Sequence, residues 1–85
     1  KVENNTPVRT ILKGQIEAIT VKDEGYTILV KHEGEIQSLY ARLNEVLVEV
    51  NQEVLASQVI GRTGSSLYFE LRNMDGPLNP GIILK

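Results

Sequence analysis

The chain lacks cysteine and tryptophan, and it has a single histidine and a single phenylalanine. Without a thiol it can form neither a disulfide framework nor a thiolate metal site. One histidine with scattered carboxylates does not supply the three or four ligands that a zinc site takes. The small number of aromatic residues leaves only a modest hydrophobic core for a chain of this length.

Clusters of basic residues and long apolar runs are also missing. The net charge is −2 and no basic run occurs, which argues against a nucleic-acid surface, because such surfaces need clustered Lys and Arg. No apolar run approaches the roughly 18 residues that cross a bilayer, and no signal peptide is present, so we expect no direct membrane insertion. The first residue is Lys1 rather than methionine. We expect residues 1–85 to be one domain of a longer protein.

What the chain does contain is a series of short extended segments between turns. The clearest spans residues 26–32 and is joined by the tight turn at Glu33 and Gly34 to a partner at 35–41. Turn residues separate the remaining segments at intervals of about 8 to 12 residues. This pattern predicts an all-β fold, a small antiparallel β-sandwich or barrel with short strands.

Residues 65–72, Ser-Ser-Leu-Tyr-Phe-Glu-Leu-Arg, form a predicted strand with two different faces. Its leucine and phenylalanine side chains alternate with polar ones and take the core face. Residues 63–65 are expected to be a flexible connection that leads into this strand. The opposite face is either solvated or lines a groove, and it carries Ser66, Tyr68, Glu70 and Arg72.

Few residues suggest catalysis. His32 lies in a predicted strand and is expected to be structural or exposed. No serine has the Gly-x-Ser-x-Gly context of a nucleophile elbow, and the glycines at 61–64 precede a strand, so they offer no helix N-terminus to a phosphate. Residues 48–61 have a rhythm that also occurs in biotinyl and lipoyl carrier domains. Those domains need a lysine at a hairpin tip, whereas Lys31 lies within a strand.

The same rhythm resembles the LytM, or lysostaphin-like, zinc endopeptidase family, and this resemblance runs along nearly the whole chain. It implies the family's all-β fold with a central groove. Five segments carry it in order and with fitting spacing: Thr-Pro-Val with Gly-Gln-Ile (6–16), the hairpin at 25–34, Ser-Leu-Tyr-Ala-Arg-Leu (38–43), Ser-Leu-Tyr-Phe-Glu-Leu-Arg (66–72) and Leu-Asn-Pro (78–80).

The chain departs from active members at the positions that carry chemistry. Arg42 stands where they have one catalytic histidine, Ser66 where they have another, and Tyr68 where they have a zinc ligand. The other two ligands, a His and an Asp four apart, would precede Thr6, and residues 1–5 supply neither. A phenol stays protonated near neutral pH, with a pKa of about 10, and an arginine repels a cation. We therefore predict no zinc, no other cofactor and no peptidase activity.

Degenerate LytM domains of this form resemble the EnvC-type murein hydrolase activators. The resemblance implies a module of the periplasm or cell envelope that binds the regulatory helix of a peptidoglycan amidase, N-acetylmuramoyl-L-alanine amidase, in the emptied groove at cell division. It also implies an upstream coiled coil that docks to a membrane complex. Tyr68 and Arg72 would then bind the partner, with Tyr40 beside them and Ile16 on the groove wall.

The residues suggest the same geometry. Tyr40 and Arg42 are two residues apart and are expected to share a face. If their strand neighbours the one at 65–72, two tyrosines and two arginines line one concave surface with Ser66 and Glu70. Tyrosine and arginine dominate interface energetics, and a helix with acidic and apolar residues would suit this groove.

Other functions stay open on the sequence. The domain could be an inactive partner or scaffold subunit of an active LytM endopeptidase or cell-envelope complex. It could bind peptidoglycan itself, with Arg42 and Arg72 meeting the carboxylates of stem peptides. An enzyme with different chemistry is a third alternative, although no arrangement of nucleophile and base is evident.

Overall fold

A computed structural model describes residues 6–23, 25–73, 76–77 and 82–84. These residues form eight strands and a single 3₁₀ turn, η1, and no α-helix. They include no helix long and apolar enough to span a membrane. The elements are β1 (Thr6–Arg9), β2 (Gly14–Lys22), β3 (Gly25–Lys31), η1 (Glu33–Glu35), β4 (Ile36–Val46), β5 (Glu53–Val54), β6 (Val59–Asn73), β7 (Gly76–Pro77) and β8 (Ile82–Leu84).

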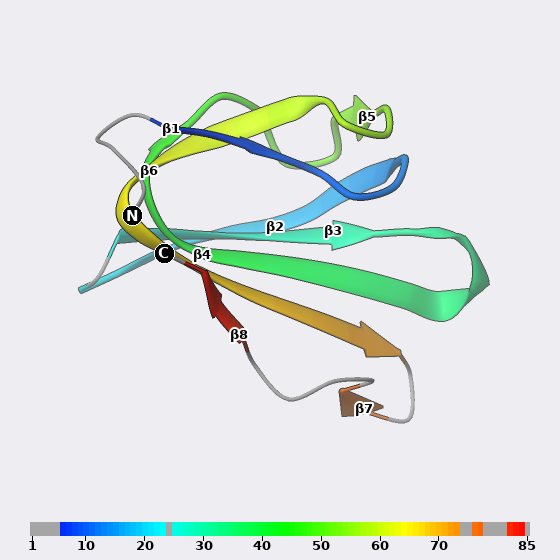
Figure 1. The fold of residues 1–85 in the computed structure, drawn as a ribbon. Helices are drawn as coiled ribbons and strands as arrows, with labels where there is room; N and C mark the ends of the chain where they lie inside the picture. The colour runs from blue at the N-terminus through cyan, green and yellow to red at the C-terminus, as the bar shows by residue number, and fades with distance from the viewer. Residues whose placement is uncertain (1–5, 24, 74–75, 78–81, 85) are drawn as a thin grey trace.

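The strands belong to one antiparallel sheet in the order β1-β6-β4-β3-β2-β5, and β7 and β8 pair with the second half of β6. Figure 1 shows that this sheet curls like half a barrel, so that β1 and the first half of β6 lie above β2 and β3. The predicted all-β antiparallel fold is confirmed. The hairpin of β3 and β4 is present where expected, and η1 makes its turn.

Strand β6 is longer than the sequence suggested. Residues 63–65 are not a flexible connection, because β6 continues through them from Val59 to Asn73. Two glycines of β6 allow residues of β4 to approach its backbone closely. A Cβ on Gly61 would lie 2.5 Å from the carbonyl oxygen of Glu45, and a Cβ on Gly64 would lie 2.5 Å from the side-chain amide nitrogen of Asn44. Glycine therefore lets β6 stay against β4 where the sheet bends.

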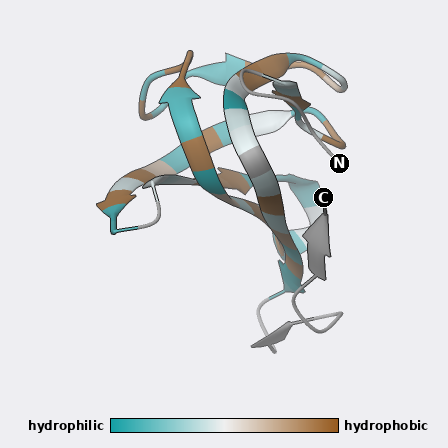
Figure 2. Cartoon of the chain, turned by 60° about the vertical axis from the view of Figure 1, so that its left-hand side comes forward, coloured by the Kyte–Doolittle hydropathy of each residue, from teal (hydrophilic) through white to brown (hydrophobic). Residues whose placement is uncertain are grey.

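The core lies inside the curl of the sheet. Apolar and polar residues alternate along the strands, as Figure 2 shows, so each strand turns one set of side chains inward. Leu67 and Phe69 pack against the core, as predicted for the apolar face of β6. The buried apolar residues are Val8, Ile16, Ile28, Val30, Tyr40, Leu43, Val48, Val54 and Ile60.

His32 is a buried structural residue at the end of β3, with 5% of its surface exposed. Its Nδ1 donates to the carbonyl oxygen of Lys13 at 2.7 Å, since a carbonyl can only accept. Its Nε2 lies 2.7 Å from the hydroxyl of Ser38, which is fully buried. The ring thus joins the loop before β2 to β3 and β4, in agreement with the structural role expected from the sequence.

Replacement of His32 by alanine is expected to destabilise the fold by about 2–4 kcal/mol, because it leaves a cavity and two buried polar groups without their partner. Urea unfolding followed by circular dichroism would measure the loss. Lys31→Ala is the control, since its exposed side chain should change stability by less than about 0.5 kcal/mol. Equal stabilities for the two variants would contradict this role for His32.

Candidate functional site

The polar side chains of β6 face away from the core. Tyr68, Glu70 and Arg72 project together, and their neighbours on β4 are Ala41, Leu39 and Gln37 in the same order. The row continues onto β3, where Leu29 lies opposite Leu39, and onto β2, where Ala18 lies opposite Leu29. We call this side of the sheet the groove face. Its centre is apolar and its β6 margin is polar.

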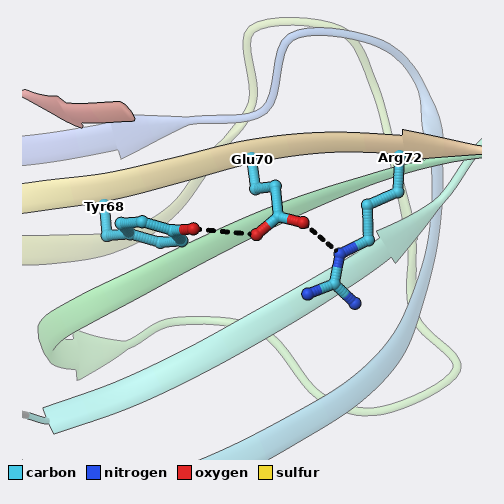
Figure 3. Close-up of polar contacts among 3 residues, drawn as sticks. All are labelled: Tyr68, Glu70 and Arg72. Carbon is cyan, nitrogen blue, oxygen red and sulfur yellow. Dashed lines mark hydrogen bonds and ion pairs between the residues drawn. The ribbon is translucent and has the colours of Figure 1, made fainter. Parts of the chain in front are cut away.

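Glu70 links the other two polar side chains of this margin (Figure 3). The Tyr68 hydroxyl donates to one carboxylate oxygen at 2.9 Å. The Nε of Arg72 donates to the other oxygen at 2.7 Å and forms an ion pair with it. The Glu70 side chain is only 10% exposed, whereas that of Arg72 is 39% exposed. The carboxylate is therefore held from both sides, and the guanidinium meets solvent.

These contacts shift the pKa values of all three groups. The hydrogen bond from Arg72 lowers the pKa of the Glu70 carboxyl, and burial only partly opposes this effect. The hydrogen bond that Tyr68 donates to Glu70 raises the pKa of the phenol, so the hydroxyl keeps its proton at neutral pH. Glu70 likewise raises the pKa of Arg72. At neutral pH the trio consists of a neutral phenol, an anion and a cation.

A concavity of about 300 Å³ opens beside this trio. Three cations and one carboxylate border it, so its charge is positive although the whole chain is slightly negative. Arg72 uses its Nε on Glu70, and within the described part of the chain its two terminal nitrogens have no partner. The concavity is lined by Lys22, Thr27, Leu39, Ala41, Arg42, Tyr68, Glu70 and Arg72.

Arg42 reaches the groove face at a bulge in the pairing of β4 with β6. Its φ of 68° lies in the left-handed region, and the pairing of β4 with β6 shifts between Ala41 and Leu43. Between the pairs Ala41–Tyr68 and Leu43–Thr63, β4 has one residue and β6 has four. This irregularity lets Ala41 and Arg42 both border the concavity, while Leu43 returns to the core.

The expectation that Tyr40 shares a face with Arg42 is wrong. Tyr40 lies opposite Phe69 on the core face, with ring centroids 5.4 Å apart, and is 1% exposed. The bulge breaks the alternation that the expectation assumed. The Tyr40 hydroxyl instead accepts a hydrogen bond from the backbone N–H of Ile11 at 3.1 Å. Ile16 also lies in the core, fully buried, and not on a groove wall.

The structure thus brings together four of the predicted residues, Tyr68, Glu70, Arg72 and Arg42. Ser66 is half-buried and does not line the concavity, and its carbonyl oxygen accepts from the Thr63 hydroxyl.

The sequence reasoning missed Lys22, Thr27, Leu39 and Ala41. Alternation along 36–41 already predicted that the Leu39 side chain lies on the other face of the strand from Tyr40. The same alternation could have identified Leu39 and Ala41 as residues of the site. Lys22 and Thr27 gave no comparable signal, because they reach the concavity from other strands.

The resemblance to LytM zinc endopeptidases implies a zinc ion, and the described residues do not fit one. They contain no group of three or more His, Cys, Asp or Glu side chains that could hold a metal. Of the candidate donors beside the concavity, the Tyr68 hydroxyl keeps its proton and Glu70 is engaged by Arg72. Arg42 and Arg72 add positive charge that opposes a cation. The segment before Thr6, where the family resemblance implies two further zinc ligands, lies outside the described residues.

The sequence matches the model of peptidase family M23 over residues 1–80, and the chain belongs to this family. The resemblance to LytM, or lysostaphin-like, domains is thereby confirmed, and the family match leaves the carrier-domain alternative without support.

Three curated relatives are similar to most of this chain. An uncharacterized protein of Haemophilus influenzae is 39% identical over 83 residues, which cover 88% of the chain. The NlpD/LppB homolog of Buchnera aphidicola is 34% identical and covers 92%. Stage II sporulation protein Q of Bacillus subtilis is 31% identical and covers 84%. The chain spans only 20%, 26% and 27% of these proteins, respectively.

Solved structures share the fold. The catalytic domain of lysostaphin from Staphylococcus simulans matches with a TM-score of 0.84 and 25% identity, over 93% of this chain and 70% of that domain. A chain in a crystal structure of the SpoIIIAH and SpoIIQ complex matches with a TM-score of 0.79 and 30% identity, over 87% of this chain and 59% of the matched one. The family fold therefore occurs both in a peptidase and in a structure of a protein complex.

The charge of Glu70 is expected to stabilise the fold in a pH-dependent way. Its pKa is lower in the folded chain, so the contribution of the carboxylate is present above the ordinary pKa of a glutamate, about 4.3, and is lost as the pH falls through the lowered value. Glu70→Gln should therefore cost stability on the order of 1 kcal/mol at pH 7 and much less at pH 3. Urea unfolding of both proteins between pH 3 and pH 7 would measure the difference.

Glu45→Gln provides the matched control. Glu45 forms an ion pair with Arg62 at 3.7 Å, and both side chains are nearly half exposed. Exposed pairs contribute little, so this variant should change stability by less than about 0.5 kcal/mol. A pH-independent loss in Glu70→Gln would refute the ion-pair explanation.

Proposed function

We propose that this chain is a non-catalytic M23 module of the bacterial cell envelope that activates a peptidoglycan amidase by binding its regulatory helix on the groove face. The observation that carries the proposal is the trio of Tyr68, Glu70 and Arg72. Tyr68 stands where the family resemblance implies a zinc ligand in active members, and Arg72 presents a guanidinium to solvent beside it.

The groove face suits an acidic, amphipathic segment. Glu70 holds the Nε of Arg72, which orients the guanidinium and leaves its terminal nitrogens available to a carboxylate. Arg42 and Lys22 border the same concavity and favour a second acidic group. Leu39 and Ala41 offer an apolar floor to aliphatic side chains. A helix with acidic and apolar residues on one side meets all three conditions.

Loss of the Arg72 guanidinium is expected to weaken activation strongly. Arg72→Ala should reduce stimulation of the source organism's amidase on purified peptidoglycan by about tenfold or more, and Arg72→Glu should abolish it, because an acid would face the acidic partner. Tyr68→Phe should have a smaller effect, since it keeps the ring. Dye release from labelled sacculi would measure each variant.

The matched control is Lys13→Glu, which makes the same change in charge at an exposed side chain away from the concavity. It should activate normally. Thermal unfolding of every variant would separate lost binding from lost folding. Full activation by a folded Arg72→Glu variant would exclude the groove face as the binding site.

The purified domain is also expected to hold no zinc and to cleave no peptidoglycan peptide. Elemental analysis after exposure to equimolar zinc should show far less than one zinc per chain, because the donor set beside the concavity does not fit the ion. Zinc bound in a one-to-one ratio would refute the non-catalytic assignment.

A second candidate is a scaffold role without any amidase. Its support is the similarity to stage II sporulation protein Q and to a chain in the SpoIIIAH and SpoIIQ complex. Co-purification from the source organism with a structural envelope protein or an intact LytM peptidase, without stimulation of any amidase, would select this role.

A further inference from the structure

The outer edge of β2 is unusually open. β5 pairs only with Gly14 and Gln15, and the backbone of Ile16 bonds to Asn51 and Gln52. Beyond this point, no strand among the described residues pairs with the edge of Ala18–Lys22. Figure 1 shows this end of β2 at the left margin of the sheet, in the hairpin with β3. The edge presents backbone donors and acceptors to another strand.

The other edges of the sheet are protected. β1 contains Pro7, which lacks an N–H group, and the exposed Arg9. β5, β7 and β8 have only two or three residues each. The open half of β2 has neither proline nor charge before Lys22, and its Val21 is 72% exposed. This segment therefore has the composition of a strand that pairs rather than one that avoids pairing.

We propose that Ala18–Lys22 forms an antiparallel strand pair with the same segment of a second copy of this chain, around a two-fold axis at Thr20. In this register Thr20 lies opposite its own copy. Ile19 lies opposite Val21 of the second copy, which gives two β-branched pairs. Ala18 lies opposite Lys22. The proposal concerns the edge of the sheet and does not depend on what binds the groove face.

Charge complementarity selects this occupant. The pairing of β2 with β3 shifts between Ile16 and Ala18, so Glu17 is the extra residue of a bulge. Its carboxylate accepts from the Gln37 amide at 2.8 Å, which places it on the groove face beside Ala18. Lys22 also lines the groove face. The two-fold pair therefore brings Lys22 of each copy next to Ala18 and Glu17 of the other.

A neighbouring register fits less well. An axis at Val21 would place Ile19 opposite Asp23, an apolar side chain against an acid. A five-residue strand pair buries less than the roughly 1,000 Å² of a stable interface, so we infer a reversible dimer with a Kd on the order of 100 µM. Because the axis is perpendicular to the sheet, both groove faces would lie on the same side of one continuous sheet.

Disulfide trapping tests the register. The chain has no cysteine, so single substitutions report on one position each. Thr20→Cys should form a disulfide dimer under mild oxidation, since directly opposite residues have Cα atoms about 5 Å apart. Ala18→Cys is the matched control on the same strand. Its two copies would be about 13 Å apart and should stay monomeric.

A mixture of Ala18→Cys and Lys22→Cys chains should form a mixed disulfide, because these positions lie opposite each other. Equal cross-linking of Thr20→Cys and Ala18→Cys, or none for Thr20→Cys, would overturn the register.

Sedimentation equilibrium from about 10 µM to 1 mM tests the dimer without cross-linking. The natural chain should associate with concentration, and Val21→Lys should remain monomeric with an unchanged circular dichroism spectrum. Lys22→Glu should weaken association at least tenfold, and Glu17→Lys combined with Lys22→Glu should restore it. A natural chain that stays monomeric at 1 mM, or a Val21→Lys variant that still associates, would overturn the proposal.

Discussion

The rest of the structure depends on how β4 and β6 pair. These two strands supply both the core and the groove face, and their register decides which side chain goes where. Phe69 lies opposite Tyr40 and turns inward, while Tyr68 lies opposite Ala41 and turns outward. The pairing spans the bend of the sheet because its register shifts at Arg42, which has a positive φ, and because Gly61 permits close approach. A side chain at Gly61 would press the carbonyl of Glu45 and disturb both faces at once.

Glu70 holds together the polar side chains that this pairing turns outward. A nearly buried carboxylate is costly unless its oxygens are bonded, and here both oxygens accept strong hydrogen bonds. The same bonds orient the phenol and the guanidinium. Consequently this part of β6 forms a fixed, cation-bearing surface. The network accounts for a solvent-facing guanidinium at a site where the described residues have no group that could hold a metal ion.

Much of the fold could be predicted from local patterns. The hairpin of β3 and β4, the alternation along 66–72 and the all-β class follow from period two and from turn residues. The same alternation correctly separated Leu67 and Phe69 from Tyr68, Glu70 and Arg72. Tyr40 was misplaced because the bulge at Arg42 breaks the alternation between these two residues, so that Arg42 borders the concavity and Tyr40 stays in the core. A bulge arises from the pairing of two strands, and the sequence of one strand does not reveal it.

The sequence alone determined the chemistry available at the site. It set Arg42, Ser66 and Tyr68 at positions where the family resemblance implies histidines in active members, because the identity of a side chain needs no folding. Only the tertiary structure decided that Lys22, Leu39 and Ala41 join Arg42, Tyr68 and Arg72, and that Tyr40 and Ile16 do not. Lys22 lies on β2, and Leu39 and Ala41 lie on β4. The order of the strands in the sheet, β6-β4-β3-β2, brings these residues to one concavity.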